Sequence, residues 1–209
     1  QIFESEALGL AELLKAEAIR IPQVLAKGSD FLLLEWIDKS NKITESTMEL
    51  FGYQFAKLHQ FHGKKFGFRL DNFLGDTPQL NIPTNEGSKN WVTFFIENRL
   101  MYQLELTKKN GHATQELLKS LENLIEKIPN ILSGTEEAPT LLHGDLWSGN
   151  YLIDESGNPC LIDPAVYYGH READLAMTSL FGGFTDAFYS AYETELPLLP
   201  EYFEREPIY

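Results

Sequence analysis

The chain has 209 residues, of which 43% are hydrophobic and 23% charged, values typical of a globular protein and not of a disordered one. Its net charge of −14 argues against nucleic acid or an anionic membrane as a partner, because both need a basic surface. No apolar run approaches the ~20 residues of a membrane span, and no signal-peptide pattern is present. The single cysteine, Cys160, lies in an apolar segment and fits a buried thiol in a reducing, cytoplasmic compartment.

The first 37 residues predict a helix followed by a β-hairpin. Apolar residues at helical spacing indicate an amphipathic helix over residues 2–18, and Glu6 falls on its apolar face. A carboxylate on an inward face is costly unless it is paired, although Glu6 at the edge of that face would be solvated. Residues 24–26 and 31–34 then indicate two strands around a Lys-Gly-Ser-Asp turn.

Two further helices follow from the same helical spacing of apolar residues. The first covers residues 46–59, where Ser46 and Glu49 form a capping-box pattern. The second covers residues 114–128 and is expected to end at Pro129.

The segment between these helices offers candidate substrate residues. Residues 64–87 are polar, with Gly and Pro at intervals, and predict a long loop of the kind that is often functional. Asp71 and Asn72 are candidate ligand-ordering residues there, although Asx turns explain them equally well. Trp91 begins a helix over residues 89–106 and is either a core residue or an aromatic face for a sugar ring.

The most informative stretch covers residues 141–165. It contains an apolar run, a polar loop and two short strands joined by a turn at residues 155–159. Because a hairpin brings its two ends together, we expect Asn150 and Asp163 to lie side by side with Asp145 opposite.

These three side chains suit phosphoryl transfer. Mg²⁺ between ATP phosphates takes oxygen ligands such as an Asp carboxylate and an Asn carbonyl, and a further carboxylate accepts the proton of the attacking hydroxyl. Asp145 and Asn150 have the Asp-to-Asn spacing of the protein-kinase catalytic loop, and Asp163 opens a second segment. His-Gly-Asp alone would also fit an ordinary turn, but the full set in this order favours a kinase site.

A helix is expected over residues 172–191, with a break near Gly182 and Gly183. Asp174 stands at its start, where a carboxylate caps the helix and complements its dipole. Short strands mixed with helices along the chain predict an α+β fold.

Several runs of this sequence resemble the fructosamine kinase family, the ketosamine-3-kinases of the protein-kinase-like superfamily, to which aminoglycoside phosphotransferases also belong. The resemblance covers almost the whole chain, and it rests on two blocks together, because the His-Gly-Asp core alone would indicate only a small-molecule kinase. The first block comprises residues 143–150 (HGDLWSGN), 161–165 (LIDPA) and 168–176 (YGHREADLA). The second comprises residues 66–68 (FGF), 71–72 (DN), 75–79 (GDTPQ), 91–95 (WVTFF) and 99–100 (RL).

The resemblance implies a two-lobed kinase-like fold. Residues 1–37 would be the remnant of a truncated N-terminal lobe, ending in the hinge, and residues 38–209 the mainly helical C-terminal lobe with the catalytic loop and metal site. The chain does not begin with Met, so we expect an internal piece of a longer protein whose glycine-rich phosphate loop and strand lysine precede residue 1. The isolated piece is then expected to have little kinase activity. Oligomeric state is left open.

The resemblance also implies roles for the site residues. Asp145 would be the catalytic base, Asn150 and Asp163 would bind ATP through Mg²⁺, and Glu6 would pair with the strand lysine that holds the phosphates.

The hinge would be formed by Glu35, Trp36 and Ile37, whose backbone groups would pair with adenine. The candidate substrate residues are Asp71, Asn72, Trp91 and Trp147, and the candidate structural supports are His143 and Asp174.

The implied reaction transfers the ATP γ-phosphoryl group to the 3-hydroxyl of a ketosamine, a fructosamine or ribulosamine either free or protein-linked. The product is unstable and frees the amine, which reverses glycation. Two alternatives remain open: another small-molecule kinase, acting on an aminoglycoside, choline or methylthioribose, and a non-catalytic binding protein on the same fold. Asp163 is followed by Pro164-Ala165 instead of Phe-Gly, and the rigid proline argues against loop-flip regulation.

Overall fold

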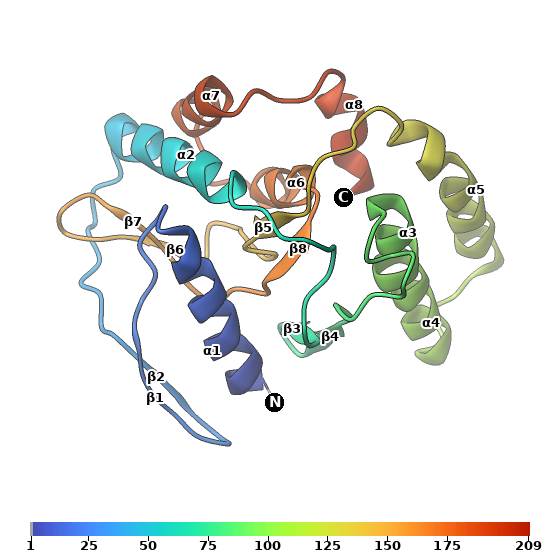
Figure 1. Cartoon of the computed structure of the whole chain (residues 1–209), viewed down its shortest axis with the longest axis horizontal. Coiled ribbons are helices and arrows are strands. Elements are labelled where there is room, and N and C mark those ends of the chain that lie inside the picture. Colours follow the sequence, from blue (N-terminus) through green and yellow to red (C-terminus); the bar gives the residue numbers. More distant parts are fainter. Residues whose placement is uncertain (1) are drawn as a thin grey trace.

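The computed structural model describes residues 2–209, which form helices and four two-stranded antiparallel ribbons (Figure 1). The helices are α1 (Ile2–Leu13), η1 (Leu14–Ala16), α2 (Glu45–His59), α3 (Trp91–Phe95), η2 (Ile96–Met101), α4 (Tyr102–Lys109), α5 (Gln115–Ile131), α6 (Glu172–Leu180), α7 (Asp186–Glu195), α8 (Tyr202–Arg205) and η3 (Glu206–Ile208). The strands are β1 (Val24–Lys27), β2 (Leu32–Leu34), β3 (Asn72–Leu74), β4 (Thr77–Gln79), β5 (Thr140–Leu142), β6 (Tyr151–Ile153), β7 (Pro159–Leu161) and β8 (Tyr167–Gly169).

Two ribbons frame the central segment. β6 pairs with β7 as a hairpin, with Leu152 opposite Cys160, and β5 pairs with β8, with Leu141 opposite Tyr168. The loop from β5 to β6 and the segment from β7 to β8 therefore both connect one ribbon to the other. These two connections carry the polar residues of the central motif.

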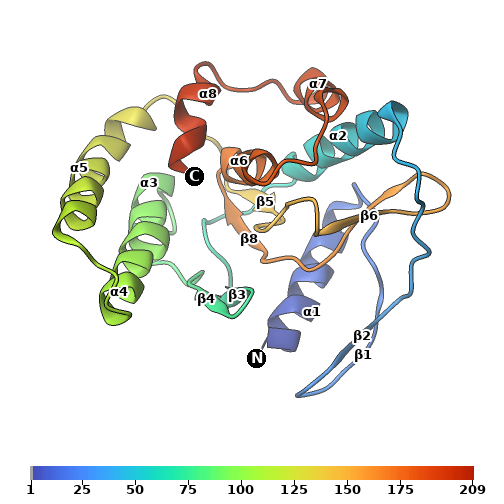
Figure 2. The same cartoon turned by 180° about the vertical axis from the view of Figure 1, so that it is seen from behind.

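The central segment packs against a pair of helices, α2 and α7. α2 and α7 lie side by side in both views (Figures 1 and 2). Gly52 makes this contact possible, because a Cβ atom at this position would overlap the Phe188 carbonyl group. The larger buried cluster joins this helix pair to α1 and to the β6–β7 hairpin, through side chains such as Leu10, Phe51 and Leu161.

A second buried cluster lies under the helices of the middle of the chain. It joins α3, α5 and β8 through Phe94, Ile128 and Tyr167. The segment before residue 37 packs into the first cluster through Leu10 and Leu13, so the two proposed lobes share buried contacts. The domain boundary at residue 37 stays a prediction.

Several element boundaries differ from the sequence prediction. α2 begins at Glu45 with Thr44 as its N-cap, whose hydroxyl accepts the Thr47 N–H at 3.2 Å, so the Ser46 capping box was wrong. α5 continues past Pro129 to Ile131, because the proline removes one intrahelical hydrogen bond while the Leu132 N–H still bonds the Ile128 carbonyl at 2.9 Å. The first helix was predicted to residue 18, but α1 ends at Leu13.

Two further predictions are corrected. The predicted loop over residues 64–87 contains the β3–β4 hairpin, and the predicted helix over residues 89–106 is interrupted by the π-helical turn η2. The expected break near Gly182 and Gly183 is confirmed, because α6 ends at Leu180 and α7 begins at Asp186. None of the helices in residues 2–209 is both long and apolar enough to cross a membrane.

Candidate active site

Asp145, Asn150 and Asp163 meet at the open end of the β6–β7 hairpin. The Asn150 side-chain nitrogen donates to the Asp145 carboxylate at 2.9 Å and to the Asp145 carbonyl at 2.8 Å. The same nitrogen lies 3.4 Å from the Asp163 carbonyl oxygen. The backbone continues the pairing, since the Ile162 N–H donates to the Asn150 carbonyl at 3.0 Å. The structure thus brings together the three residues that the hairpin argument placed side by side.

The orientation of the Asn150 amide decides what the site can hold. All three acceptors engage its nitrogen, and among residues 2–209 no donor reaches its side-chain oxygen. That oxygen and the Asp163 carboxylate are hard donors of the kind that Mg²⁺ takes. Within the described residues, no group of three or more His, Cys, Asp or Glu side chains could hold a metal ion.

Asp163 has a strained backbone. Its φ is +52°, and only Glu17 and Glu201 share a positive φ among the non-glycine residues of the described chain. Such conformations cost about 1–3 kcal/mol and concentrate at functional sites. The side chain of Asp163 is exposed, so this strain is not the result of burying the carboxylate. It is consistent with a carboxylate held in position for a ligand.

A side chain of α6 holds the loop between β5 and β6, which carries Asp145. The Asp174 carboxylate accepts the N–H of His143 at 2.7 Å and that of Gly144 at 2.8 Å. Gly144 has a φ of +82°, and a Cβ there would overlap the Ala165 carbonyl, so only glycine fits this turn. The Ala165 N–H in turn donates to the His143 carbonyl at 2.9 Å. Asp174 therefore fixes the backbone immediately before Asp145, as a supporting residue.

His143 links the two connections through its imidazole. Its Nε2 donates to the Ile162 carbonyl at 3.0 Å, and its Nδ1 accepts the Asp145 N–H at 3.3 Å. Burial lowers the pKa of His143, so the ring is neutral and both contacts are served by one tautomer. His143 thus connects the segment that carries Asp145 to the segment that carries Asp163, and both of its ring nitrogens are engaged within the protein.

Burial gives Asp145 the electrostatic character of a base. Loss of solvent raises the pKa of its carboxyl to about 6, and the negative charges of Asp163 and Asp174 add to this effect, while the Asn150 hydrogen bond opposes it. A carboxylate with this pKa is mostly ionised at neutral pH, yet it takes up a proton more readily than an exposed one.

Glu6 faces the same site from α1. Burial, and then the nearby charge of Asp163, raise the pKa of Glu6. A half-buried carboxylate near a second negative charge takes up a proton more readily than a solvated one. The placement agrees with the inward face predicted for Glu6, and its role toward ATP remains a proposal.

The predicted hinge is anchored by an arginine that the sequence analysis did not single out. Arg20 donates to the Glu35 carboxylate at 2.7 Å and also forms an ion pair with Asp154 in the β6–β7 turn. The side chain of Glu35 is therefore engaged, and that of Trp36 is 84% exposed, while Ile37 is buried. Arg20 stands alone between apolar residues in the sequence, and that isolation was the available signal.

Asp71 and Asn72 are both engaged in hydrogen bonds within the protein, Asp71 half-buried and Asn72 buried, and their role toward a substrate stays a prediction. Asp71 accepts the Asn81 N–H at 2.6 Å, and Asn72, only 4% exposed, donates to the Val166 carbonyl at 2.9 Å. Gln79 donates both to the Asn72 side-chain oxygen and to the Ala165 carbonyl. This network fastens the β3–β4 hairpin to the segment that follows Asp163.

Trp91 belongs to the core, which corrects its alternative role as a sugar-stacking face. It is 7% exposed, its ring stacks on those of Phe94, Phe95 and His170, and its Nε1 donates to the Tyr209 hydroxyl at 3.2 Å. Both ring faces are thus occupied by protein.

Trp147 is the one candidate substrate residue that lies at the surface of the catalytic loop. It is 39% exposed, folds over Gly149, and meets the exposed ring of Phe181 edge-on at 5.9 Å. Its ring is accessible two residues from Asp145, and its role toward a substrate stays a prediction.

Comparison with known proteins assigns the family. The family model described as "Fructosamine kinase" matches residues 1–209. A protein of Synechocystis named "Probable ketoamine kinase" is 40% identical, and the match covers 100% of this chain and 70% of that protein. A "Protein-ribulosamine 3-kinase, chloroplastic" of Arabidopsis thaliana is 35% identical, over 100% of this chain and 64% of that protein.

Solved structures agree with the sequence relatives. The crystal structure of a "putative fructosamine-3-kinase" from Thermobifida fusca has a TM-score of 0.89 and 34% identity, over 99% of this chain and 70% of that one. The gentamicin complex of APH(2")-IIa has a TM-score of 0.61 at 15% identity, over 98% of this chain and 69% of that one, and shows the shared kinase-like fold alone. The chain belongs to the fructosamine kinase family.

Proposed function

We propose that this protein transfers the γ-phosphoryl group of ATP to the 3-hydroxyl of a ketosamine. The single observation that supports it most is the Asn150 amide, whose nitrogen joins the Asp145 carboxylate to the Asp163 backbone. This contact brings the proposed base together with the two proposed oxygen ligands, and phosphoryl transfer to an alcohol requires such a set.

Asp145 is the proposed base. In the reaction it accepts the proton of the acceptor hydroxyl as the oxygen attacks phosphorus, and its pKa of about 6 leaves it ionised at neutral pH. The Asn150 side-chain oxygen and the Asp163 carboxylate are the proposed ligands of Mg²⁺, which neutralises phosphate charge when bound. Holding hydroxyl and phosphate in line supplies most of the remaining acceleration.

The nucleotide site extends beyond these residues. Glu6 is proposed to pair with the lysine that holds the phosphates, and the backbone of Glu35, Trp36 and Ile37 to pair with adenine. Residues 1–209 contain no glycine-rich phosphate loop in their sequence. We therefore expect little turnover from residues 1–209 alone and full activity from the complete polypeptide that the gene encodes.

The acceptor is proposed from the relatives. One relative is named for ketoamines and another for protein-ribulosamine, so a fructosamine or ribulosamine, free or on a protein lysine, is the acceptor that we expect. Trp147 is the proposed contact for its apolar part, since it lies exposed beside Asp145. The phosphorylated product would release its amine, which makes the reaction a repair of glycated amines.

The test measures ATP consumption by the complete polypeptide with ribulose-linked or fructose-linked lysine, and with kanamycin and choline as competing acceptors. We expect turnover with the ketosamines only, and its loss in Asp145→Ala. Faster turnover with kanamycin or choline would show that the protein is another small-molecule kinase and not a ketosamine kinase. Binding of a ketosamine without ATP consumption would favour a non-catalytic binding protein.

We propose the cytoplasm as the place of this reaction. Cys160 is buried, and burial raises the pKa of its thiol to about 12, so the thiol is inert. A free, unreactive cysteine and a need for ATP both suit a reducing compartment.

A further inference from the structure

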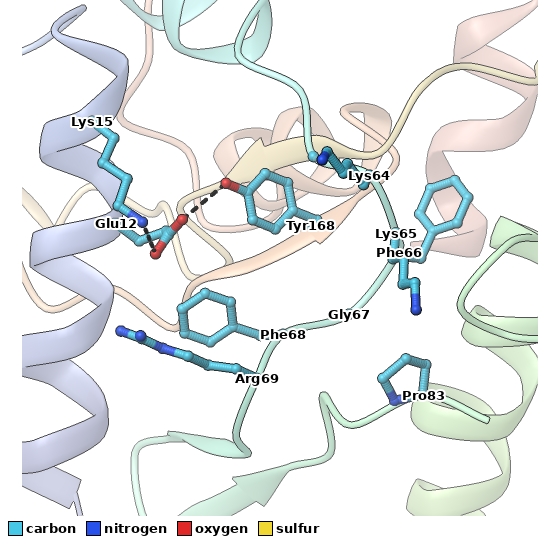
Figure 3. Close-up of a pocket in the computed structure, with 11 residues that line it drawn as sticks. Glu12, Lys15, Lys64, Lys65, Phe66, Gly67, Phe68, Arg69, Pro83 and Tyr168 are labelled. Carbon is cyan, nitrogen blue, oxygen red and sulfur yellow. Dashed lines mark hydrogen bonds and ion pairs between the residues drawn. The ribbon is translucent and has the colours of Figure 1, made fainter. Parts of the chain in front are cut away.

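A cavity lies beside the C-terminal end of α1, apart from the candidate active site. Its volume is about 570 Å³, and it lies between the C-terminal half of α1 and residues 63–69 (Figure 3). Glu12 reaches it from α1 and Lys15 from η1, and Tyr168 of β8 lies between the two walls. This volume falls within the range of small-molecule sites in proteins.

The cavity is positively charged in a strongly negative protein. Four cationic side chains line it, against a single carboxylate, that of Glu12. Glu12 is already engaged, since it accepts from Lys15 at 2.8 Å and from the Tyr168 hydroxyl at 3.0 Å. The remaining cations are Lys64, Lys65 and Arg69, and within residues 2–209 no carboxylate oxygen lies within 4.0 Å of their nitrogens.

This charge arrangement favours an anion. The chain carries a net charge of −14, so a site that concentrates unpaired cations runs against the general field of the protein. Arg69 and the two lysines are exposed and would lose little hydration on meeting a phosphate. Arginine and lysine bind phosphate through charge-assisted hydrogen bonds, which are stronger than neutral ones.

The rest of the lining describes the body of the ligand. Phe68, Tyr168 and Pro83 form its apolar walls, and the Arg69 guanidinium lies 5.6 Å from the centre of the Phe68 ring. Phe66 is only 6% exposed and packs on Trp91, so it adds little accessible surface. The lining contains no Ser, Thr, Asn or Gln side chain, and the Tyr168 hydroxyl is taken by Glu12. Sugar hydroxyls would find no neutral side-chain partners here, whereas a flat aromatic ring would find faces to pack against.

We propose that this cavity binds a small phosphate ester with a planar aromatic body, such as a nucleoside monophosphate. Lys64, Lys65 and Arg69 hold the phosphate, and the half-buried rings of Phe68 and Tyr168 hold the base. The site is separate from the phosphoryl-transfer site, and its lining shares no residue with it.

α1 connects the two sites. Glu6 lies close to Asp163, a Cβ on Gly9 would stand 3.2 Å from Val166, and Glu12 bonds Tyr168. Three positions along the helix therefore lie close to the segment from Asp163 to Tyr168. An anion that joins Lys15 to residues 64–69 clamps the far end of the helix that carries Glu6.

The test uses pyridoxal 5′-phosphate, itself an aromatic phosphate ester. Its aldehyde condenses with a lysine amine, losing water, and borohydride then reduces the imine to a stable amine that peptide mapping locates. We expect Lys64 and Lys65 to be labelled well before Lys119 and Lys127, which are equally exposed on α5. AMP at ten times its dissociation constant should lower that labelling about tenfold, and ribose 5-phosphate, adenosine and inorganic phosphate much less.

A matched pair of variants separates the site from general charge. Arg69→Gln removes a cation from the cavity, and Lys119→Gln removes one from α5. We expect AMP to protect about tenfold less well in Arg69→Gln and unchanged in Lys119→Gln. Labelling spread evenly over exposed lysines, equal effects of the two variants, or equal protection by ribose 5-phosphate would overturn the proposal.

Discussion

The Asn150 side-chain nitrogen lies 2.9 Å from the Asp145 carboxylate and donates a hydrogen bond to it. The same nitrogen reaches the Asp163 carbonyl at 3.4 Å, so one amide group holds the proposed base against the proposed metal segment. Because protein acceptors engage the nitrogen of this amide, only the oxygen of the same amide remains to bind a ligand. Base, amide and metal carboxylate therefore respond together to any change in the loop.

Asp145→Asn should remove the base without moving the loop. An asparagine keeps the shape of the side chain and still bonds Asn150 after an amide flip, but it cannot take a proton. We expect turnover to fall by about 10² to 10⁴-fold, with a melting temperature close to that of the parent. The measurement is steady-state ATP consumption by the complete polypeptide with a ketosamine.

Asp76→Asn is the matched control, because it makes the same chemical change at an exposed turn beyond β3. It should leave turnover within about twofold of the parent. A loss in Asp76→Asn as large as that in Asp145→Asn would show that net charge and not the base sets the rate.

Asp163→Gly should separate stability from activity. Glycine adopts the observed φ of +52° freely, and this relief roughly offsets the greater entropy of glycine in the unfolded chain. We expect the free energy of unfolding to change by less than about 1 kcal/mol, while half-maximal activity needs about tenfold or more Mg²⁺. Chemical denaturation and a Mg²⁺ titration of activity provide the two readouts.

Asp163→Asn serves as the comparison, because asparagine also tolerates a positive φ but lacks the charge. It should resemble Asp163→Gly in its Mg²⁺ requirement. If both variants kept the Mg²⁺ dependence of the parent, Asp163 would not be a metal ligand.

The approach of Asn150 and Asp163 could be predicted from the sequence because it depends on local geometry. A short hairpin with a strong turn leaves little freedom for its ends, so both residues had to emerge together. The position of Asp174 at the start of a helix could also be predicted, but its expected capping role was wrong. α6 has no side-chain cap, and the carboxylate accepts the N–H groups of His143 and Gly144, 31 and 30 residues earlier in the chain.

Contacts between distant segments could not be predicted in this way. Asn72 and Trp91 look like ligand-facing residues in sequence, but tertiary packing buried both, one among backbone carbonyls and the other among aromatic rings. Arg20 reaches Asp154 across more than a hundred residues, and no local pattern announces that pair. Thr44 replaced Ser46 as the cap of α2 because two candidates two residues apart satisfy the same rule.

Asp174→Ala should destabilise the fold strongly. Its carboxylate accepts the N–H groups of His143 and Gly144 in a buried setting, and the substitution leaves both without acceptors. We expect the free energy of unfolding to fall by about 2–5 kcal/mol, measured by chemical denaturation. Asp186→Ala, at the exposed first turn of α7, should cost no more than about 1 kcal/mol. Equal losses in the two variants would contradict a bracing role for Asp174.

Acidification from pH 7.5 to 6.0 should weaken the fold through three buried histidines. Burial lowers the pKa of His59, His143 and His170 in the folded protein. The unfolded chain, with histidines near 6.5, then binds more protons than the folded one, so stability is complete above this pH and is lost as the pH falls below it. The raised pKa of Asp145 acts in the opposite direction and offsets a small part of the loss.

The net loss over this range should be about 2 kcal/mol in the free energy of unfolding, obtained from urea denaturation at each pH. His112→Gln, at an exposed loop position, provides the control and should leave the pH dependence unchanged. His59→Gln should reduce it by about a third, because one of three neutral buried imidazoles is gone. Stability that stays constant or rises at pH 6.0 would mean that these rings are charged inside the fold, which their packing against Phe55, Tyr192 and Trp91 opposes.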